Sequence, residues 1–460
     1  MQMLIGGRWT DASDGSVIQV VNSATQAPLD TIPQATQEDV QRALKQAQQG
    51  RLLWAGTPVH ERCRILYRCA DTIDAHREEL ARSLSTEMGK IIRESRSEIR
   101  VCAQIFRGFA EAAAHHYGKT LTDAPIGTEK DILFTRHEPL GVIACISPFN
   151  YPVELASQKI AAALAAGNAV IVKPATDNPL PLIRLIGLCA QAGLLAESPL
   201  VAAISLTGST EVGLAVAQKA MKSLKRVFLE LGGNDPFIVL DDANLERSVQ
   251  AAVSGRIQNC GQTCCSPKRF LVHESVHDAF VAGLMEAFTQ LHHGSPLDER
   301  TDVGCLISPR AAMEVERQVR HTIEQGAALV CGGHAYDSTY FEPTVLDGVT
   351  SEMDAARDME IFGPVFPIMT FRSDAEAVEL ANATSYGLQG GVMSRSMERA
   401  MQVASALHCG GVAINASGNY RHFEQPFGGW KMSGLGREGV SVTLSEMSQE
   451  KTYILKNVLA

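Results

Sequence analysis

The feature that most constrains the fold is an alternation of short apolar segments with helix-like segments, which begins at Gly141. Segments of this kind are typical of buried strands, and they occupy residues 142–147, 169–173, 202–206 and 227–229. A second set begins at Phe237 and includes residues 270–273. Near-continuous apolar strands that alternate with helices are typical of parallel, doubly wound sheets. The sequence therefore predicts two α/β units, joined near residues 230–233.

The N-terminal part has a different pattern. Residues 1–30 contain turn residues between short strand-like segments. Thr57 followed by Pro58 predicts the start of a long helix, whose apolar face continues to Leu84. Another long helix is expected over residues 91–116, and the alternating segment 131–138 predicts a strand.

Length and charge exclude several classes of protein. A chain of 460 residues is too long for one core, so more than one domain is expected. The formal net charge of −10 argues against binding to nucleic acid or an anionic membrane. No apolar run reaches the ~18 residues of a membrane span. The N-terminus lacks a basic region followed by an apolar run, so we expect a cytoplasmic protein with reduced thiols.

Three cysteines lie within six residues, at Cys260, Cys264 and Cys265. A zinc site would need a second pair of Cys or His ligands at matching spacing, and we find none, so no metal is expected. Adjacent residues 264 and 265 cannot both face one cleft, so at most one is expected to be a nucleophile. Taken alone, each cysteine is better explained as a small buried hydrophobic residue than as a nucleophile.

Polar residues follow the predicted strands where a doubly wound sheet binds ligands. Asn150 could donate hydrogen bonds to an oxyanion or could be a turn residue. Lys173 could reach a ribose or phosphate or could be a solvated lysine. Gly208 and Ser209 begin a helix whose free N–H groups attract phosphate, although most such turns bind nothing. Glu230 lies in an apolar run, where burial would raise its pKa towards that of a general base, unless it is a paired structural glutamate.

Taken together, these segments resemble the aldehyde dehydrogenase superfamily of the NAD(P)-dependent, hydrolytic type. The resemblance covers nearly the whole length, and the motifs occur in the family's order. They lie at residues 148–150, 172–174, 208–213, 230–233, 261–264, 360–364 and 426–429.

The resemblance implies a catalytic role for three residues. Cys264 would attack the aldehyde carbon, and Asn150 with the N–H of Cys264 would hold the oxyanion. Glu230 would activate the water that hydrolyses the thioester. Family members that pass the acyl group to coenzyme A tend to lack this glutamate, so we predict a free carboxylic acid as product.

The resemblance also implies NADP or NAD as cofactor. Glu360 would bind the nicotinamide ribose, with Phe362 against the ring. Lys173 would bind the adenosine ribose and Ser209 the pyrophosphate. The remaining residues expected in contact with the cofactor are Thr176, Gly208, Val212 and Leu231.

The implied fold consists of two doubly wound α/β domains and a small β arm. A Rossmann-like cofactor domain would comprise residues 1–119 and 139–230, and the catalytic domain residues 231–435. The arm, residues 120–138 and 436–460, would mediate a homodimer or homotetramer. No nucleic acid or membrane is expected as a partner.

Two features depart from the family pattern. Thr176 stands where many NAD-specific members carry a glutamate that repels a 2′-phosphate, so we predict that NADP is used. Only residues 194–201 separate a predicted helix from the next strand, where relatives usually carry a further strand and helix. This predicts a cofactor domain one edge strand short, with weakened cofactor affinity.

The substrate is expected to be a small aldehyde. The residues predicted to contact it are Tyr151, Gln158, Arg421, His422 and Phe427. Arg421 could pair with an anionic group, as on a semialdehyde or hydroxyaldehyde, or could be a surface arginine. Gln158 stands where related helices often place an aromatic residue or an arginine, and the missing arginine counts against a standard succinate-semialdehyde site. The alternatives are a cysteine-dependent esterase-like hydrolase and an inactive member of the family.

Overall fold

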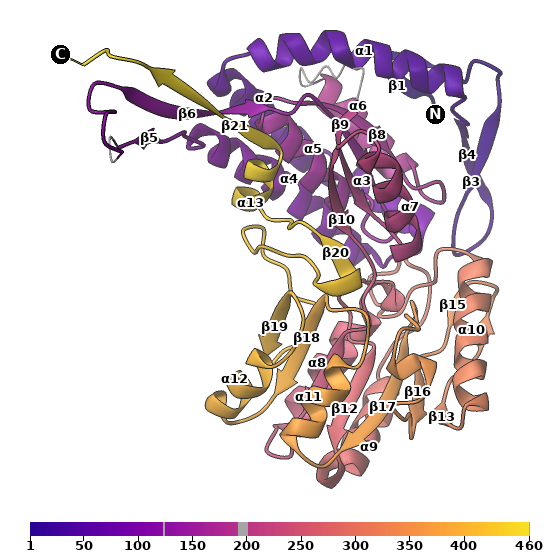
Figure 1. Ribbon diagram of the computed structural model, residues 1–460. Helices are drawn as coiled ribbons and strands as arrows, with labels where there is room; N and C mark the ends of the chain where they lie inside the picture. The colour runs from indigo at the N-terminus through magenta and orange to yellow at the C-terminus, as the bar shows by residue number, and fades with distance from the viewer. Residues whose placement is uncertain (123–124, 192–200, 460) are drawn as a thin grey trace.

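The computed structural model of this protein describes residues 1–122, 125–191 and 201–459. Two α/β domains lie one above the other, and a narrow β arm extends from the upper one (Figure 1). Each domain contains a mainly parallel sheet, which confirms the predicted fold class.

The N-terminal part consists of two hairpins and four helices. The hairpins pair β1 with β2 and β3 with β4, and the helices are α1 to α4. Their bounds are Met3–Ile5, Arg8–Thr10, Val17–Val21 and Pro28–Pro33 for the strands, and Gln37–Gly56, Val59–Ala75, Arg77–Met88 and Ile92–Ala114 for the helices.

Two local predictions are wrong here. Thr57 does not begin a helix: it ends α1, and its hydroxyl donates to the carbonyl of Leu53 at 2.9 Å. The predicted single helix is broken at His76 into α2 and α3. The apolar periodicity runs through the break because both helices bury their faces in the same core, which the pattern alone cannot separate.

The upper sheet has the order β20-β10-β9-β7-β8. Strands β7 to β10 are parallel, and β20 is antiparallel to β10. The strands span Val142–Ile146, Ala169–Lys173, Val201–Thr207, Arg226–Glu230 and Gly434–Leu435. The helices between them are α5 (Glu154–Ala165), α6 (Leu180–Gln191) and α7 (Thr210–Met221).

Among the described residues, β8 is the last strand on its side of this sheet. Helix α1 packs beside it, with Ala47 contacting Val142, Ala169 and Ile171. The short connection over residues 194–201, on which the prediction of a missing edge strand depends, lies outside the described residues except for Val201, the first residue of β9.

The lower sheet has the order β13-β16-β17-β12-β11-β18-β19. Its strands β11 to β13 and β16 to β19 span Pro236–Val239, Arg269–His273, Ala328–Cys331, Thr344–Asp347, Val365–Phe371, Gln389–Met393 and Gly411–Ile414. Helices α8 to α12 span Leu245–Ile257, His277–Phe288, Pro309–Glu324, Asp374–Asn382 and Met397–Ser405. A small hairpin pairs β14 (Ala335–Tyr336) with β15 (Tyr340–Phe341).

Aromatic packing fixes the centre of this sheet. The rings of Phe270 and Phe366, on neighbouring strands, stack at 5.0 Å, and Phe237 lies 5.8 Å from Phe270. All three side chains are fully buried. Burial of one such side chain stabilises a fold by about 1.5–3 kcal/mol, so these strands form a rigid base for the loops at their ends.

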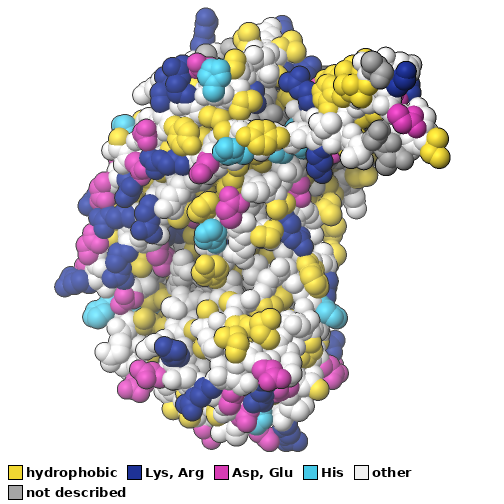
Figure 2. Space-filling view, turned by 90° about the vertical axis from the view of Figure 1, so that its left-hand side faces the viewer, with side chains coloured by type: hydrophobic (Ala, Val, Ile, Leu, Met, Phe, Trp, Pro, Cys, Tyr) yellow, Lys and Arg dark blue, Asp and Glu magenta, His cyan; other side chains and the backbone are white. Residues whose placement is uncertain are grey.

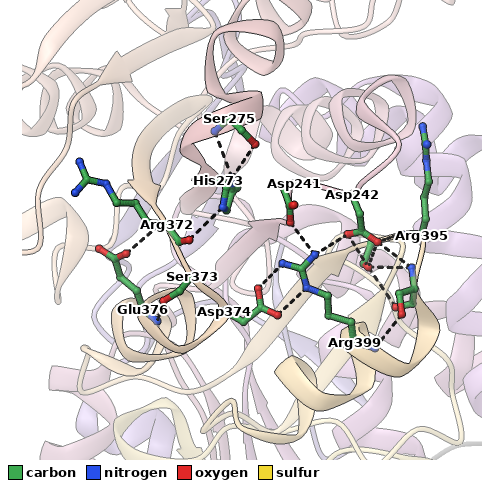
Figure 3. A network of polar contacts seen from close by, with 12 residues as sticks. Asp241, Asp242, His273, Ser275, Arg372, Ser373, Asp374, Glu376, Arg395 and Arg399 are labelled. Carbon is green, nitrogen blue, oxygen red and sulfur yellow. Dashed lines mark hydrogen bonds and ion pairs between the residues drawn. The ribbon is translucent and has the colours of Figure 1, made fainter.

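Ion pairs close one edge of the lower sheet. At the carboxyl ends of β11, β17 and β18, Arg399 contacts Asp241 at 2.7 Å and Asp374 at 2.6 Å, and Asp242 accepts from Ser394 (Figure 3). Parallel sheets usually bind ligands at this edge. The amino ends of the strands lie on the other side of this sheet, where the connection from β10 enters β11.

The arm is a three-stranded antiparallel sheet of β5, β6 and β21. The strands span Thr120–Leu121, Ile132–Pro139 and Ser448–Leu455, and the rings of Phe134 and Tyr453 stack at 5.0 Å. Helix α13 (Val440–Glu446) leads into the arm. Exposed hydrophobic side chains gather on the arm (Figure 2); they are Leu121, Ile126, Ile454, Leu455, Val458 and Leu459. No helix in the described part of the chain could cross a membrane.

Candidate active site

The candidate site lies where the two sheets face each other. The carboxyl ends of β7, β8, β9 and β10 in the upper sheet lead to Asn150, Lys173, Gly208 and Glu230. The loop before β12 in the lower sheet carries Cys264. The turn after Glu230 meets this loop, because a Cβ on Gly233 would lie 3.3 Å from the Cys264 carbonyl oxygen.

The Cys264 loop is held in an unusual conformation. Asn259 and Cys260 have positive φ angles of 51° and 54°. Gly261, with φ of 75°, passes so close to Gly363 that a Cβ would lie 2.2 Å from the Gly363 carbonyl oxygen. Only glycine fits there, so the loop is locked against the segment that carries Glu360.

Of the three clustered cysteines, Cys264 alone is partly exposed, since Cys260 and Cys265 are 3% and 7% exposed. A hydrogen bond with the Cys265 thiol and burial raise the pKa of Cys264 well above its ordinary value. Cys264 is therefore accessible to a ligand. Its raised pKa means that a nearby base or cation must favour the thiolate before it can act as a nucleophile.

Asn150 is fixed beside the Cys264 loop. Its Nδ2 donates to the carbonyl of Gln262 at 3.1 Å, which leaves the second amide hydrogen available. Its own carbonyl accepts from Nδ2 of Asn259 at 3.0 Å and from Nζ of Lys90 at 2.8 Å. The side chains of Asn150 and Asn259 thus join Asn150 to the Cys264 loop, and Lys90 fixes the Asn150 backbone.

Glu230 is a buried carboxyl group with unused hydrogen-bonding capacity. It is 7% exposed, and its Oε2 has no hydrogen-bond partner among the described residues. Burial first, and the carboxylate of Glu438 second, raise the pKa of Glu230 well above its ordinary value. A carboxyl group of this kind suits a general base that acts on a water molecule.

The sequence reasoning missed two charged residues near Glu230, Lys159 and Glu438. Lys159 Nζ contacts Glu438 Oε1 at 2.5 Å and donates to Thr207 Oγ1 at 2.7 Å. Arg421 donates to Glu438 Oε2 at 2.7 Å. The available signal was Lys159 itself, because a lysine inside an apolar, alanine-rich helix needs a buried partner.

Several of the predicted cofactor residues lie at or just after the carboxyl ends of β8, β9 and β10. Ser209 is the N-cap of α7, where its Oγ accepts from the N–H of Val212 at 3.3 Å, so a phosphate would meet the helix N-terminus. Gly232 leaves room for Glu360, since a Cβ there would lie 2.3 Å from Glu360 Oε2. The other predicted cofactor residues differ in burial. Lys173, Thr176, Ser209 and Val212 are exposed. Gly208 and Phe362 are half-buried, and Leu231 is buried.

The predicted substrate residues differ in exposure. Tyr151 and Arg421 are half-buried and His422 is exposed, and the Arg421 guanidinium stacks 3.9 Å above the Phe427 ring. Phe427 is buried against Cys265, with Cys264 beside them. Gln158 is 1% exposed and lines a small cavity that Glu230 and Glu438 also line. Arg421 is thus brought near Glu230, one of the predicted catalytic residues, but one of its N–H groups is already paired with Glu438.

Comparison with known sequences gives a consistent picture. Residues 9–453 match the profile of the "Aldehyde dehydrogenase family". The succinate-semialdehyde dehydrogenase [NADP(+)] of Escherichia coli (strain K12) is 36% identical over 459 residues, which cover 95% of this chain and 94% of that protein. The 3-sulfolactaldehyde dehydrogenase of Pseudomonas putida is 35% identical over 477 residues, covering 99% of this chain and 97% of that protein.

A comparison of folds agrees. The crystal structure of succinate-semialdehyde dehydrogenase from Burkholderia pseudomallei superposes with a TM-score of 0.95 at 36% identity. The superposition covers 99% of this chain and 98% of that chain.

Proposed function

This chain belongs to the aldehyde dehydrogenase family, and we propose that it oxidises a small anionic aldehyde to its carboxylic acid with NADP or NAD. The observation that carries this proposal is the convergence of a half-buried Cys264, an anchored Asn150 and a buried Glu230 between two α/β domains. The names of the relatives support the aldehyde class and an anionic substrate.

The chemistry follows from the residues. The Cys264 thiolate attacks the aldehyde carbon, and the free amide hydrogen of Asn150 with the N–H of Cys264 stabilises the oxyanion. NADP or NAD, held by residues such as Ser209 and Glu360, would supply the hydride acceptor for oxidation of the adduct to the thioester. Glu230 then removes a proton from water, which attacks the thioester and releases the acid and the thiol of Cys264.

The anionic group of the substrate is proposed to bind Arg421. Replacing Arg421 with alanine removes one charge-assisted pair, so kcat/KM for an anionic semialdehyde is expected to fall about tenfold or more relative to propanal. The variant also disturbs Glu438, which acts on both substrates alike, so the ratio of the two substrates within one variant is the measurement. Equal losses for both substrates would contradict a role in anion recognition.

NADP is proposed as an accepted and preferred cofactor. Thr176 and Lys173 are both exposed and lie three residues apart in the chain, so position 176 brings no carboxylate against a 2′-phosphate and Lys173 offers a cation. Absorbance at 340 nm with a panel of aldehydes and both cofactors tests this and the dehydrogenase activity together. We expect kcat/KM with NADP to equal or exceed that with NAD. A tenfold preference for NAD would contradict the prediction, and turnover of an ester without any aldehyde oxidation would favour an esterase-like hydrolase.

The arm is proposed to mediate a homodimer or homotetramer. Its exposed hydrophobic side chains, which include Ile126 and Ile454, support this because such side chains are usually covered by a partner. The domain ranges given above and a cytoplasmic location stay predictions.

A further inference from the structure

Lys268 is a buried lysine that the chemistry above does not use. Its side chain is 1% exposed, and it follows Cys264 by four residues. Its Nζ donates to the carbonyl oxygen of Cys264 and, at 3.3 Å, to that of Ser266, while its backbone N–H donates to Asp235 at 2.9 Å. Buried lysines are rare, because an unpaired buried ammonium group destabilises the fold. The partner of Lys268 therefore indicates its role.

The partner of Lys268 is the glutamate proposed to bind the cofactor. The Nζ of Lys268 lies 3.3 Å from Oε1 of Glu360, which also accepts from the N–H of Gly233 at 3.2 Å. Glu360 therefore rests on the turn that follows Glu230. One ammonium group thus connects the nucleophile loop, the turn after the general base and the segment that carries Glu360.

We propose that Lys268 is a positioning residue of the dehydrogenase reaction: its ammonium group fixes Glu360 and the Cys264 loop in one arrangement, and its charge favours the Cys264 thiolate. The inference rests on the proposed function, since it assigns Lys268 to the same site. It adds a residue that acts through Cys264 and Glu360 rather than on the aldehyde.

The charges around Cys264 predict in which direction each substitution changes the pKa of its thiol. Lys268 is the cation that lowers the pKa of Cys264, whereas the thiol of Cys265 and the carboxylate of Glu360 raise it. Glu230 also interacts with the thiol. Removal of the Lys268 charge and removal of the Glu360 charge should therefore change the thiolate population in opposite directions, whereas a structural role alone would damage the loop in both cases.

The test measures alkylation of Cys264 by iodoacetamide against pH in the cofactor-free enzyme, with the labelled peptide identified by mass spectrometry. Lys268→Met keeps the volume and removes the charge, so we expect the rate at pH 7.5 to fall about threefold to tenfold and the titration midpoint to rise. Glu360→Gln should increase the rate at the same pH. Lys268→Arg keeps the charge and should restore most of the wild-type rate.

The chain supplies its own control. Of the eleven cysteines, all within the described ranges, only Cys264 and Cys331 are partly exposed. Cys331 lies on β13, outside the site, so its labelling rate should be the same in every variant. If Lys268→Met fails to fold, Glu360→Gln still tests the sign at a side chain that is 21% exposed, because slower labelling of Cys264 in that variant would contradict the proposal.

Two results would overturn the proposal: unchanged labelling of Cys264 in Lys268→Met, or slower labelling in both variants. Neither result bears on aldehyde turnover, because the assay contains no aldehyde or cofactor. Failure of the dehydrogenase proposal would instead show as absent turnover in the wild-type enzyme with labelling as expected.

Discussion

Replacing Cys264 with alanine is expected to abolish aldehyde oxidation, with a loss in kcat on the order of 10⁴-fold or more, because no covalent adduct can form without the nucleophile. Cys264 is the one cysteine of the cluster that is partly exposed, and Asn150 is anchored beside its loop. The measurement is cofactor reduction at 340 nm, together with the melting temperature of the variant.

Cys260→Ala and Cys265→Ala are the matched controls. Both side chains are buried, so each variant is expected to lose some stability through the small cavity it creates. Cys265→Ala also removes the thiol that raises the pKa of Cys264. This variant should therefore retain activity, with a larger fraction of Cys264 in the thiolate form at a given pH. A Cys264→Ala variant that still oxidises aldehydes, or a Cys265→Ala variant that does not, would show that the nucleophile has been assigned to the wrong residue.

Much of the sheet architecture was predictable because its strands are buried on both faces. Strand β8 spans the predicted residues, and β7 and β12 differ from prediction by one residue. Several later elements were not predicted, including α10, α12 and β18. Helix α12 had a usable signal, since Ser396 caps it by accepting from the N–H of Arg399.

The site was predictable in a different way. The positions of Asn150, Glu230 and Cys264 came from a family resemblance, and the local patterns alone left each with an ordinary structural explanation. Their environments could not be read from the sequence, because burial and charge pairing arise from segments far apart in the chain. The contact of Lys268 with Glu360 joins residues that lie 92 positions apart.

The contacts of Arg421 show that proximity to the predicted site does not by itself establish a role in substrate binding. The sequence indicated that it could pair with an anionic substrate, and the structure places it over Phe427 and in contact with Glu438. A substrate anion would therefore compete with Glu438 for the guanidinium. The pairing links substrate recognition to Glu230, because Glu438 is the neighbouring carboxylate that raises the pKa of Glu230.

Glu230→Gln is expected to separate the two halves of the reaction. The variant should release a first burst of reduced cofactor, about one equivalent per site, because formation of the thioester does not need Glu230. Steady-state turnover should then fall about 10²- to 10⁴-fold, because the water that hydrolyses the thioester has lost its general base. Stopped-flow absorbance at 340 nm resolves both phases. Glu87→Gln is the matched control, since Glu87, on α3, is another buried glutamate whose pKa burial raises, to about 8, and its carboxylate accepts from the N–H of Leu180 at the start of α6.

The pH dependence gives the same assignment a second test. Because burial and Glu438 raise the pKa of Glu230, its carboxyl group ionises, and can act as a base, only at a higher pH than an ordinary glutamate. The steady-state rate of the wild-type enzyme should therefore increase towards alkaline pH, and Glu230→Gln should lose this increase while its burst is retained. An unchanged steady-state rate in the variant would remove Glu230 from the hydrolysis step. Loss of the burst itself would place Glu230 earlier, in the deprotonation of Cys264.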